Sequence, residues 1–356
     1  MTSSSTGRTA LDNVRVFDGR GLTEPTTIVI DGAIIGADDT GADRIDAVGA
    51  VLLPGLIDAH VHIRDHDTPA LLAAHGVTTG LDMACEPEVV ADLRNTVGTS
   101  DIRSAGRAIV GPDGMHGKFL GEPAIIRDAE QAEPAVAQRH STGSDYIKLV
   151  LEALGEGGPD AASAKAVVAE AHARGLLVIA HAATPGAYTM ALDAGADVIT
   201  HVPAGNPLPA ATIERIAAEG TIVVPTLTMM EGMAAVRGFP DAFGACLASV
   251  AAMHAAGIPI LAGTDANANP GVPMNPAFGS SLHHELELLV AAGLSPAEAL
   301  HAATAGPAER FGLADRGAIT PGLRADLVLL DADPLADITA TTRIRQIWSA
   351  GIPVPR

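Results

Sequence analysis

An apolar run, Leu53-Pro-Gly-Leu-Ile-Asp-Ala-His60-Val-His62-Ile63, ends in two histidines that are separated by a single residue. On an extended strand, side chains two positions apart lie on the same face, so His60 and His62 can bind one metal ion together. An isolated His-x-His triplet also occurs by chance in many chains. The other segments of the sequence therefore decide whether a metal site is predicted.

The composition is that of an acidic protein, long enough for a barrel of roughly 250 residues and a smaller domain. The 356 residues carry a formal net charge of -20, and the acidic side chains are spread along the chain without a basic run. A charge of this sign disfavours nucleic acids and anionic membranes as partners.

Three features predict a cytoplasmic protein. Apolar runs such as residues 175–180 are much shorter than the ~20 residues that a membrane span requires. The opening residues 1–9 lack the apolar core of a signal peptide. Two cysteines, Cys85 and Cys246, suit buried thiols in a reducing compartment. The sequence leaves open whether the chain forms a homo-oligomer.

Both ends of the chain show the strand-and-turn pattern of a small β domain. Residues 10–53 alternate apolar and polar positions, and Asp31-Gly32 between two β-branched runs is a strong hairpin signal, which predicts a small antiparallel sheet. The same pattern returns in residues 317–322, 325–330 and 344–348. We therefore expect residues 1–53 and 316–356 to pair into one composite β-sandwich domain.

Residues 54–315 alternate strand-length apolar runs with alanine-rich helical stretches, the pattern of repeated βα units. Eight such units predict the α/β class and a TIM-type (β/α)8 barrel. The predicted helices include 159–174, 185–194, 209–219, 241–256 and 281–290, and Ser295-Pro-Ala-Glu298 reads as a capping box. The predicted strands are 56–62, 77–83, 108–111, 146–151, 177–181, 198–201, 222–226 and 260–265.

Metal-binding residue types fall at or near the ends of these predicted strands. They are His60 and His62 on the first strand, Lys148 on the fourth, His181 on the fifth, His201 on the sixth and Asp265 on the eighth. In a TIM barrel the C-terminal strand ends carry the functional groups, and imidazole nitrogens and carboxylate oxygens are ordinary ligands of zinc. The convergence of these residues from separate segments therefore predicts a metal centre.

Lys148 is unusual because the chain has only three lysines and this one lies inside the apolar run 146–151. A charged ammonium would be costly to bury there and would repel metal ions. Reaction with carbon dioxide would convert the amine into a carbamate, an anion whose two oxygens can bridge two metals. Such a modification fits the expected buried position of the side chain.

Motifs along nearly the whole chain carry a resemblance to a known family. They are Pro54-Gly-Leu-Ile-Asp-Ala-His-Val-His62, Ala74-His-Gly-Val-Thr-Thr79, Tyr146-Ile-Lys148, Ala180-His181, Thr200-His201, Gly263-Thr-Asp265, Leu300-His-Ala-Ala-Thr304 and Pro321-Gly-Leu-Arg-Ala-Asp-Leu-Val328. This set resembles the amidohydrolase superfamily, specifically its two-metal members with a carboxylated lysine. Within the superfamily it is similar to the imidazolonepropionase-like group, which includes metal-dependent prolidases.

The resemblance implies two divalent metals, with zinc expected, and a bridging hydroxide between them. The implied ligands are His60, His62 and Asp265 for one metal, His181 and His201 for the second, and carboxylated Lys148 as the bridge. Two cations lower the pKa of the shared water and polarise the scissile carbonyl. Asp265 would be the general base and later the proton donor to the leaving amine. We therefore predict a binuclear hydrolase that cleaves a carbon–nitrogen amide-type bond of a small molecule.

The substrate is less well defined by the sequence. An N-acyl amino acid, a dipeptide, a cyclic amide and a carbamate are all compatible, and the loop 151–159 departs from the serine- and glycine-rich version of prolidase-like members, which puts dipeptidase activity in doubt. The residues expected to contact the substrate are His116, Tyr146, Thr228 and Asn267. A solvated loop histidine and a packing tyrosine are the simpler alternatives for the first two.

Two other functions are weighed against this prediction. A deaminase of an aminated ring, or a lactone or ester hydrolase, would use the same metal site on another electrophile. Lys148 argues against a deaminase, because deaminase members commonly use one metal and lack the lysine on the fourth strand. A non-catalytic scaffold would have lost ligands, whereas all six are present here.

Overall fold

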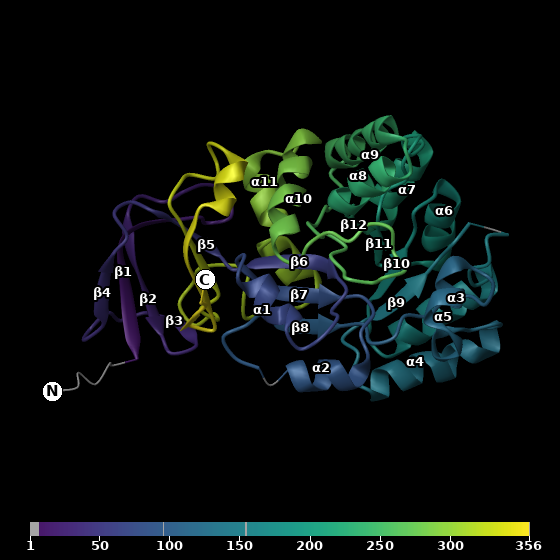
Figure 1. The fold of residues 1–356 in the computed structure, drawn as a ribbon, viewed down its shortest axis with the longest axis horizontal. Coiled ribbons are helices and arrows are strands. Elements are labelled where there is room, and N and C mark those ends of the chain that lie inside the picture. The colour runs from purple at the N-terminus through teal and green to yellow at the C-terminus, as the bar shows by residue number, and fades with distance from the viewer. Residues whose placement is uncertain (1–6, 95, 154, 356) are drawn as a thin grey trace.

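The computed structural model describes residues 7–94, 96–153 and 155–355, which form two regions of different architecture (Figure 1). At one end, strands from the start of the chain, in purple, lie beside strands from its end, in yellow. The other region combines parallel strands with helices packed around them. The predicted α/β class is therefore confirmed.

The first region contains an eight-stranded sheet with the order β15-β14-β13-β5-β1-β2-β3, in which β4 pairs with β1. Its strands are β1 Arg8–Val16, β2 Thr26–Asp31, β3 Ile34–Gly36, β4 Asp43–Asp46, β5 Val51–Pro54, β13 Leu327–Leu330, β14 Ile344–Ser349 and β15 Ile352–Pro353. The expected hairpin forms at Asp31-Gly32, where β2 and β3 pair antiparallel. Strands β4 and β5 run parallel to β1, so the expectation of an antiparallel sheet was wrong for these two strands.

Strand β5 connects this sheet to the second region. It pairs antiparallel with β13, with Val51 opposite Leu330 and Pro54 opposite Leu327. After Gly55 the chain enters β6, Leu56–Val61. The strand that carries His60 is therefore anchored at its start by a strand from the far end of the chain.

Two parallel sheets form the centre of the second region. One contains β6, β7 (Val77–Asp82) and β8 (Asp101–Ser104), and the other contains β9 (Ile147–Val150), β10 (Val178–His181), β11 (Val198–Thr200) and β12 (Ile222–Val224). Isolated parallel bridges join Ile109 to Leu149, Val223 to Ile260, and Val61 to Ala266. Segments 108–111 and 260–266 therefore extend the parallel pairing beyond these two sheets.

Two of the predicted strands are not continuous strands in the structure. Residues 108–111 make only single bridges, whereas β8, which the sequence pattern does not predict, pairs with β7. Gly106 lies between these segments with φ of 60°, and this left-handed conformation turns the chain after β8. Residues 260–266 are likewise attached through single bridges at Ile260 and Ala266.

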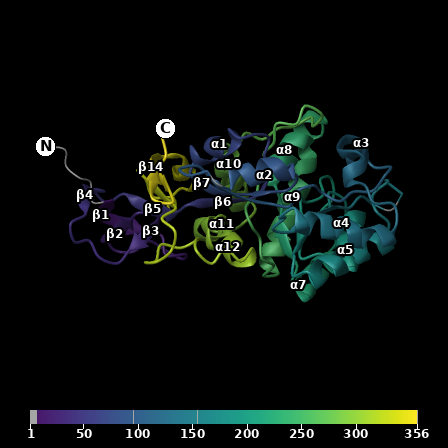
Figure 2. The same ribbon diagram turned by 90° about the horizontal axis from the view of Figure 1, so that it is seen from below.

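Helices cover the parallel strands in both ribbon views (Figures 1 and 2). Helix α6 has the predicted bounds, and Ser295 and Glu298 form the predicted capping box at the start of α11. The helix expected at 241–256 is divided into the 3-10 turn η3 and α9. The α-helices are α1 Thr68–Ala73, α2 Pro87–Leu93, α3 Met115–Leu120, α4 Ala132–Ser141, α5 Ala161–Ala173, α6 Pro185–Ala194, α7 Ala210–Glu219, α8 Leu227–Val236, α9 Gly244–Ala255, α10 Ser280–Ala291, α11 Pro296–Ala302 and α12 Ala305–Arg310, and the 3-10 turns are η1 Glu122–Ala124, η2 Ala129–Gln131, η3 Pro240–Phe243 and η4 Ile338–Thr342.

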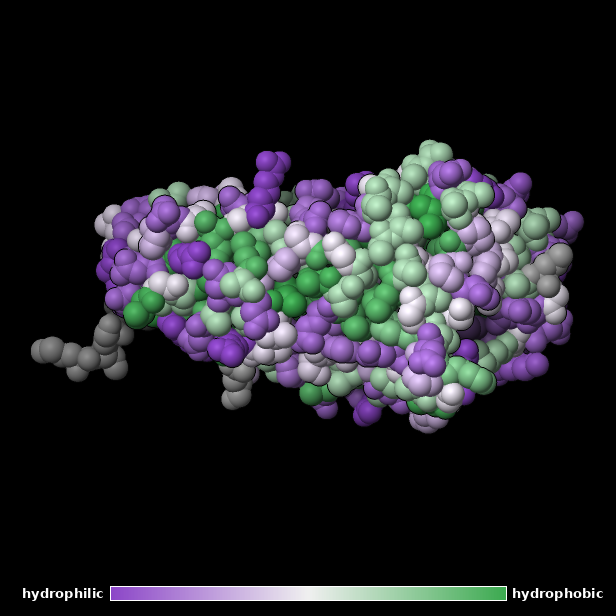
Figure 3. Space-filling model, turned by 90° about the horizontal axis from the view of Figure 1, so that it is seen from above, coloured by the Kyte–Doolittle hydropathy of each residue, from purple (hydrophilic) through white to green (hydrophobic). Residues whose placement is uncertain are grey.

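The surface seen from the top of Figure 1 mixes hydrophilic and apolar residues, with a band of apolar residues across the middle (Figure 3). Most large apolar side chains lie inside, and one buried cluster extends from β6 and β7 to helices α10 and α11. Within the described part of the chain, no helix combines the length and apolar character that crossing a bilayer requires.

Candidate metal centre

Strand β6 and the segment 262–266 place three candidate ligands side by side. The backbone N–H of Asp265 donates to the carbonyl of His60 at 2.8 Å, and that of His62 donates to Ala266 at 2.8 Å. Asp265 has φ of 57°, a left-handed conformation that is uncommon for residues other than glycine. The pairing therefore holds Asp265 next to both histidines of the His-x-His triplet.

The buried side chain of Asp58 connects strand β6 to the segment 262–266 through hydrogen bonds. Its Oδ1 accepts the backbone N–H groups of His60 at 3.1 Å and Thr264 at 3.0 Å, and its Oδ2 accepts the Thr264 hydroxyl at 2.7 Å. Burial raises the pKa of Asp58 to about 7, although these hydrogen bonds oppose the shift. This carboxyl group fixes the position of His60 relative to Asp265.

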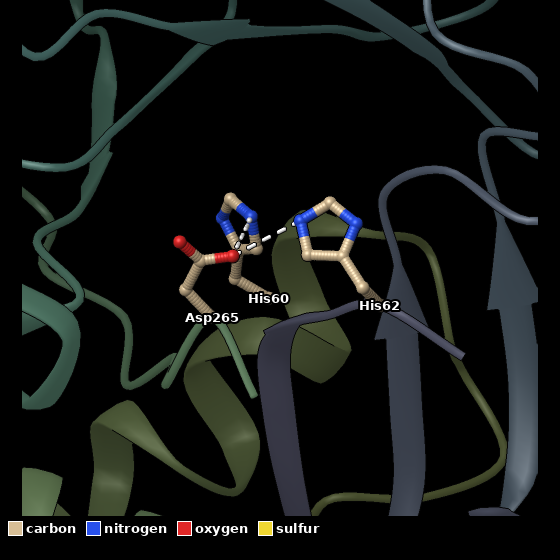
Figure 4. Close-up of side chains that lie close together, drawn as sticks. All are labelled: His60, His62 and Asp265. Atoms are coloured by element: carbon tan, nitrogen blue, oxygen red, sulfur yellow. Dashed lines mark ion pairs between the residues drawn. The ribbon is translucent and has the colours of Figure 1, made fainter. Parts of the chain in front are cut away.

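The side chains of His60, His62 and Asp265 converge (Figure 4). Asp265 Oδ1 lies 3.0 Å from His62 Nε2 and 3.3 Å from His60 Nε2. One ligand atom from each residue lies within 4.8 Å of the other two, and no second group of three His, Cys, Asp or Glu ligands in residues 7–94, 96–153 and 155–355 meets this condition. Burial alone would raise the pKa of Asp265, but His60 and His62 hold it well below its usual value. Asp265 is therefore an anion at neutral pH.

The hydrogen bonding and protonation of the His60 ring indicate whether a metal ion fits this group of three residues. His60 is 1% exposed, and neither ring nitrogen makes a hydrogen bond, although Asp265 Oδ1 lies 3.3 Å from Nε2. Burial, followed by repulsion from Lys148, lowers the pKa of His60 to about 3, so the ring is neutral at pH 7. Buried polar atoms without partners are rare, and a neutral imidazole with a free lone pair is the form that binds metals. A divalent cation fits this donor set.

His181 at the end of β10 and His201 directly after β11 continue the cluster. Their ring centroids are 4.4 Å apart, and the ring of His201 lies 5.1 Å from that of His60. Burial lowers the pKa of both histidines well below the usual value, so both are neutral. His201 Nδ1 lies 2.8 Å from the Thr226 hydroxyl, which leaves Nε2 as the nitrogen free to bind a ligand.

Lys148 on β9 points into the same interior. Its side chain is nearly inaccessible, and Nζ lies 3.0 Å from the hydroxyl of Thr200. Burial lowers the pKa of Lys148 to about 7, although Asp265 and Asp82 oppose the shift. A large fraction of this amine is therefore neutral near pH 7, and the neutral amine is the nucleophilic form.

A buried glutamate that the sequence pattern does not single out supports His201. Oε1 of Glu285 on α10 accepts the N–H of Leu227 at 2.9 Å, and Oε2 accepts the N–H and the hydroxyl of Thr228 at 2.7 and 2.9 Å. These bonds hold the start of α8, directly after Thr226, whose φ is 50°. Burial raises the pKa of Glu285 to about 7.

Three of the residues expected to contact substrate have side chains that are engaged within the fold. The Tyr146 hydroxyl lies 3.0 Å from the carbonyl oxygens of both Asp82 and Arg103. Thr228 donates to Glu285, and the Asn267 amide donates to the Asp265 carbonyl at 2.9 Å. A direct substrate contact by these three side chains stays a prediction.

His116, the fourth of these residues, lies on α3 beside the candidate ligands. Its ring centroid is 4.6 Å from that of His181, and its side chain is 28% exposed. Nδ1 lies 3.1 Å from Oε1 of Glu152, in the loop after β9. His116 is therefore both near the cluster and reachable from solvent.

The sequence contains signals that could have identified Glu285 and Glu152 as residues near the site. Glu285 lies on the apolar face of α10, three residues after Leu282 and four before Leu289, where an acidic side chain must find a buried partner. Glu152 lies four residues after Lys148 and two residues after the end of β9, at a strand end where functional groups gather in this type of fold.

Comparison with known proteins agrees with this architecture. The model of the amidohydrolase family matches residues 51–353. An uncharacterized protein of Mycobacterium tuberculosis is 30% identical over 89% of each chain. The imidazolonepropionase of Salinispora arenicola is 29% identical over 87% of this chain and 86% of its own. The solved structure of a Xaa-Pro dipeptidase with bound methionine, 22% identical, has a similar fold with a TM-score of 0.84 over 97% of this chain and 99% of its own.

These matches confirm the resemblance predicted from the motifs and, at the level of the family, the prediction of a hydrolase that acts on carbon–nitrogen bonds. Divalent metals are the general cofactors of that family, which agrees with the free nitrogens of His60. The chain belongs to the amidohydrolase family.

Proposed function

We propose that this chain hydrolyses an amide-type bond of a small molecule at two divalent metal ions. The parallel strands and the segments 108–111 and 260–266 would form a (β/α)8 barrel over residues 54–315. The sheet built from both chain ends would be a separate small domain, comprising residues 1–53 and 316–356. In this arrangement every candidate ligand lies at the C-terminal mouth of the barrel, where such enzymes carry their active sites.

The residues proposed to hold the metals differ in their chemistry. His60, His62 and Asp265 would bind one ion, with zinc suited to two imidazoles and a carboxylate. The neutral rings of His181 and His201 would bind the second. Lys148, carboxylated by carbon dioxide, would bridge the two ions, and the buried amine with its lowered pKa supports that modification.

The side chains of the protein would then transfer the proton and hold the reacting groups in position. The bound cations would supply an acidified water and a polarised scissile carbonyl. Asp265 would accept the proton of the attacking water and deliver it to the leaving nitrogen as the carbon–nitrogen bond breaks. The water oxygen ends in the carboxylic acid, and the proton ends on the amine. Asp58 and Thr226 would keep Asp265 and His201 in position for these steps.

One observation carries the proposal. His60 is buried with two ring nitrogens that no group in the described part of the chain satisfies, next to an ionised Asp265. A hydrogen-bonded structural histidine would not leave both nitrogens free. A role of His60 and Asp265 as ligands of a cation would explain this arrangement.

Replacement of Lys148 tests the proposal. Lys148→Ala should lower the metal content from two ions to one or fewer per chain, measured by elemental analysis, and should abolish amine release from a panel of N-acyl amino acids, dipeptides, lactams and carbamates. A short carboxylic acid should restore part of the activity. Lys165→Ala, which removes an exposed lysine on α5, is the matched control.

Two outcomes would contradict the proposal. A Lys148→Ala protein with two metals and full activity would eliminate the bridging role of the lysine. Release of ammonia from an aminated ring, without hydrolysis of any amide in the panel, would favour the deaminase alternative instead.

A further inference from the structure

Two loops that follow non-adjacent strand segments touch each other at the end of the molecule that carries the candidate ligands. Segment 108–111 pairs with β9, whereas segment 260–266 pairs with β6 and β12. Strands β10 and β11 separate β9 from β12 in the sheet order. All these pairings are parallel, so the loops after both segments leave at the same end of the strands. A contact between these loops therefore reaches across the strand ends.

The ring of Phe119 on α3 makes this contact with Gly271. A Cβ on Gly271 would lie 2.9 Å from Phe119 Cε2, which is closer than a side-chain carbon can approach. Gly271 does not have a positive φ, so its φ would admit a side chain that the ring excludes. The ring thus lies directly against the backbone of the loop that follows Asp265.

Helix α3 is anchored beside one of the candidate ligands. The ring centroid of His116 lies 4.6 Å from that of His181. Phe119 follows His116 by three residues, about one helical turn, so the two side chains are neighbours on the surface of the helix. Helix α3 therefore extends from His181 towards the loop that contains Gly271.

The segment 267–276, which contains Gly271, is attached on two other sides. At its start, the Asn267 amide donates to the carbonyl of Asp265 at 2.9 Å. Near its end, the side chain of Met274 lies so close to Gly232 on α8 that a Cβ on this glycine would collide with it. The segment is therefore fixed to the ligand segment and to α8, and the contact with Phe119 joins it to α3 as well.

The candidate ligands remain reachable beside this contact. The side chains of His62 and Asp265 are 23% and 13% exposed. Phe119 is 52% exposed, so the loop covers only part of its ring. The free part of the ring lies at the same end of the strands as the ligands, where it can limit the space that a substrate enters.

We propose that Phe119 is a specificity-determining residue that limits the size of the substrate groups that reach the metal centre. The ring, resting on Gly271, leaves room for compact groups, and a bulky group collides with it. Steric exclusion of this kind discriminates between substrates without adding a favourable contact. This inference rests on the proposed amide hydrolysis and specifies its substrate class as amides of compact acids and amines.

The test compares substrates that share a scissile amide but differ in bulk. N-acetylglycine is compact, N-naphthoylglycine is bulky on the acyl side, and N-acetylnaphthylalanine is bulky on the amine side. The wild-type enzyme should favour the compact substrate. Phe119→Ala should reduce this preference in kcat/KM by at least about tenfold for one or both bulky substrates. Phe239→Ala, which removes another exposed ring beyond the end of α8, is the matched control and should keep the preference.

Gly271→Ala shows whether the size limit depends on the contact between the ring and the loop. The added Cβ should displace the ring and change the preference in an otherwise wild-type protein. In the Phe119→Ala protein the same substitution should have no further effect, because the Cβ then meets no ring. Equal effects of Gly271→Ala in both backgrounds would refute a role of this contact.

A binding measurement separates this inference from the proposed function. Acetohydroxamate and naphthohydroxamate bind metal ions through the same two oxygens but differ in bulk. Calorimetry with the zinc-loaded protein should show tighter binding of the compact compound, and Phe119→Ala should lose most of this difference. If this binding pattern appears but no amide is hydrolysed, the proposed function fails and the size limit stands. If amides are hydrolysed but Phe119→Ala keeps the wild-type preference, the size limit is refuted while amide hydrolysis stands.

Discussion

Asp58→Asn should stabilise the metal-free protein relative to wild type, and it should do so more at pH 8 than at pH 5. Burial raises the pKa of Asp58 from its usual 3.8 to about 7 in the folded protein. A carboxyl pKa that is raised by folding makes the fold less stable as pH rises through the unfolded value, and the loss is complete above the folded value. Asparagine carries no charge at either pH, so this contribution disappears in the variant.

The size of the effect follows from the two pKa values. The wild-type carboxyl group should cost the fold about 1.5 kcal/mol at pH 5 and about 4 kcal/mol at pH 8, so the variant should gain about 2.5 kcal/mol on wild type between these pH values. The geometry should persist, because the asparagine oxygen can accept both N–H groups of His60 and Thr264 while its NH₂ group donates to the Thr264 hydroxyl.

Urea denaturation in the presence of EDTA, at both pH values, measures this difference in the free energy of unfolding. Asp43→Asn, which removes an exposed carboxylate from β4, is the control, and its difference from wild type should be the same at both pH values. If Asp58→Asn also shows a constant difference, the carboxyl group does not ionise inside the fold between pH 5 and pH 8, and the reasoning is refuted.

Three further changes test the proposed roles of residues around the cluster. Asp265→Asn should lower kcat by a much larger factor than it raises KM, and an unchanged kcat would exclude a proton-transfer role. Glu285→Ala should lower the free energy of unfolding by about 3–5 kcal/mol in urea titrations, because two buried N–H groups at the start of α8 lose their acceptor; a loss under 1 kcal/mol would contradict this. Thr226→Val should weaken metal binding in chelator competition, whereas Thr226→Ser should not, since serine keeps the hydroxyl that lies 2.8 Å from His201 Nδ1.

The sequence predicts the local elements best where their chemistry is complete within a few residues. The helix 185–194 has the predicted bounds because Thr184 caps its start and Gly195 ends it in a left-handed conformation. The capping box of α11 is likewise local, since Ser295 and Glu298 satisfy each other. Strand β8 is not predicted because its four residues carry too little alternation to distinguish a strand from a turn.

The candidate site divides in the same way. Functional groups of a TIM barrel lie at the C-terminal ends of its strands, and this rule predicts His60, His62, His181, His201 and Asp265 from the positions of the apolar runs. The rule says nothing about Glu285, whose partner Thr228 lies 57 residues away in the chain. The approach of His116 to Glu152 likewise depends on two loops packing against each other, which no local pattern encodes. Partners of this kind are determined by tertiary packing.

The pairing of β13 with β5 determines when the metal-binding strand can become fixed during synthesis. Residues 51–54 leave the ribosome early and can pair with β1 on one side. Their other neighbour, 327–330, is translated only after about three quarters of the chain length has been added. Until then the nascent polypeptide exposes an open strand edge directly before the His-x-His triplet, and open edges invite pairing with other chains. Chaperone protection of this edge, or delayed metal loading, would therefore matter most while the last part of the chain is still being made.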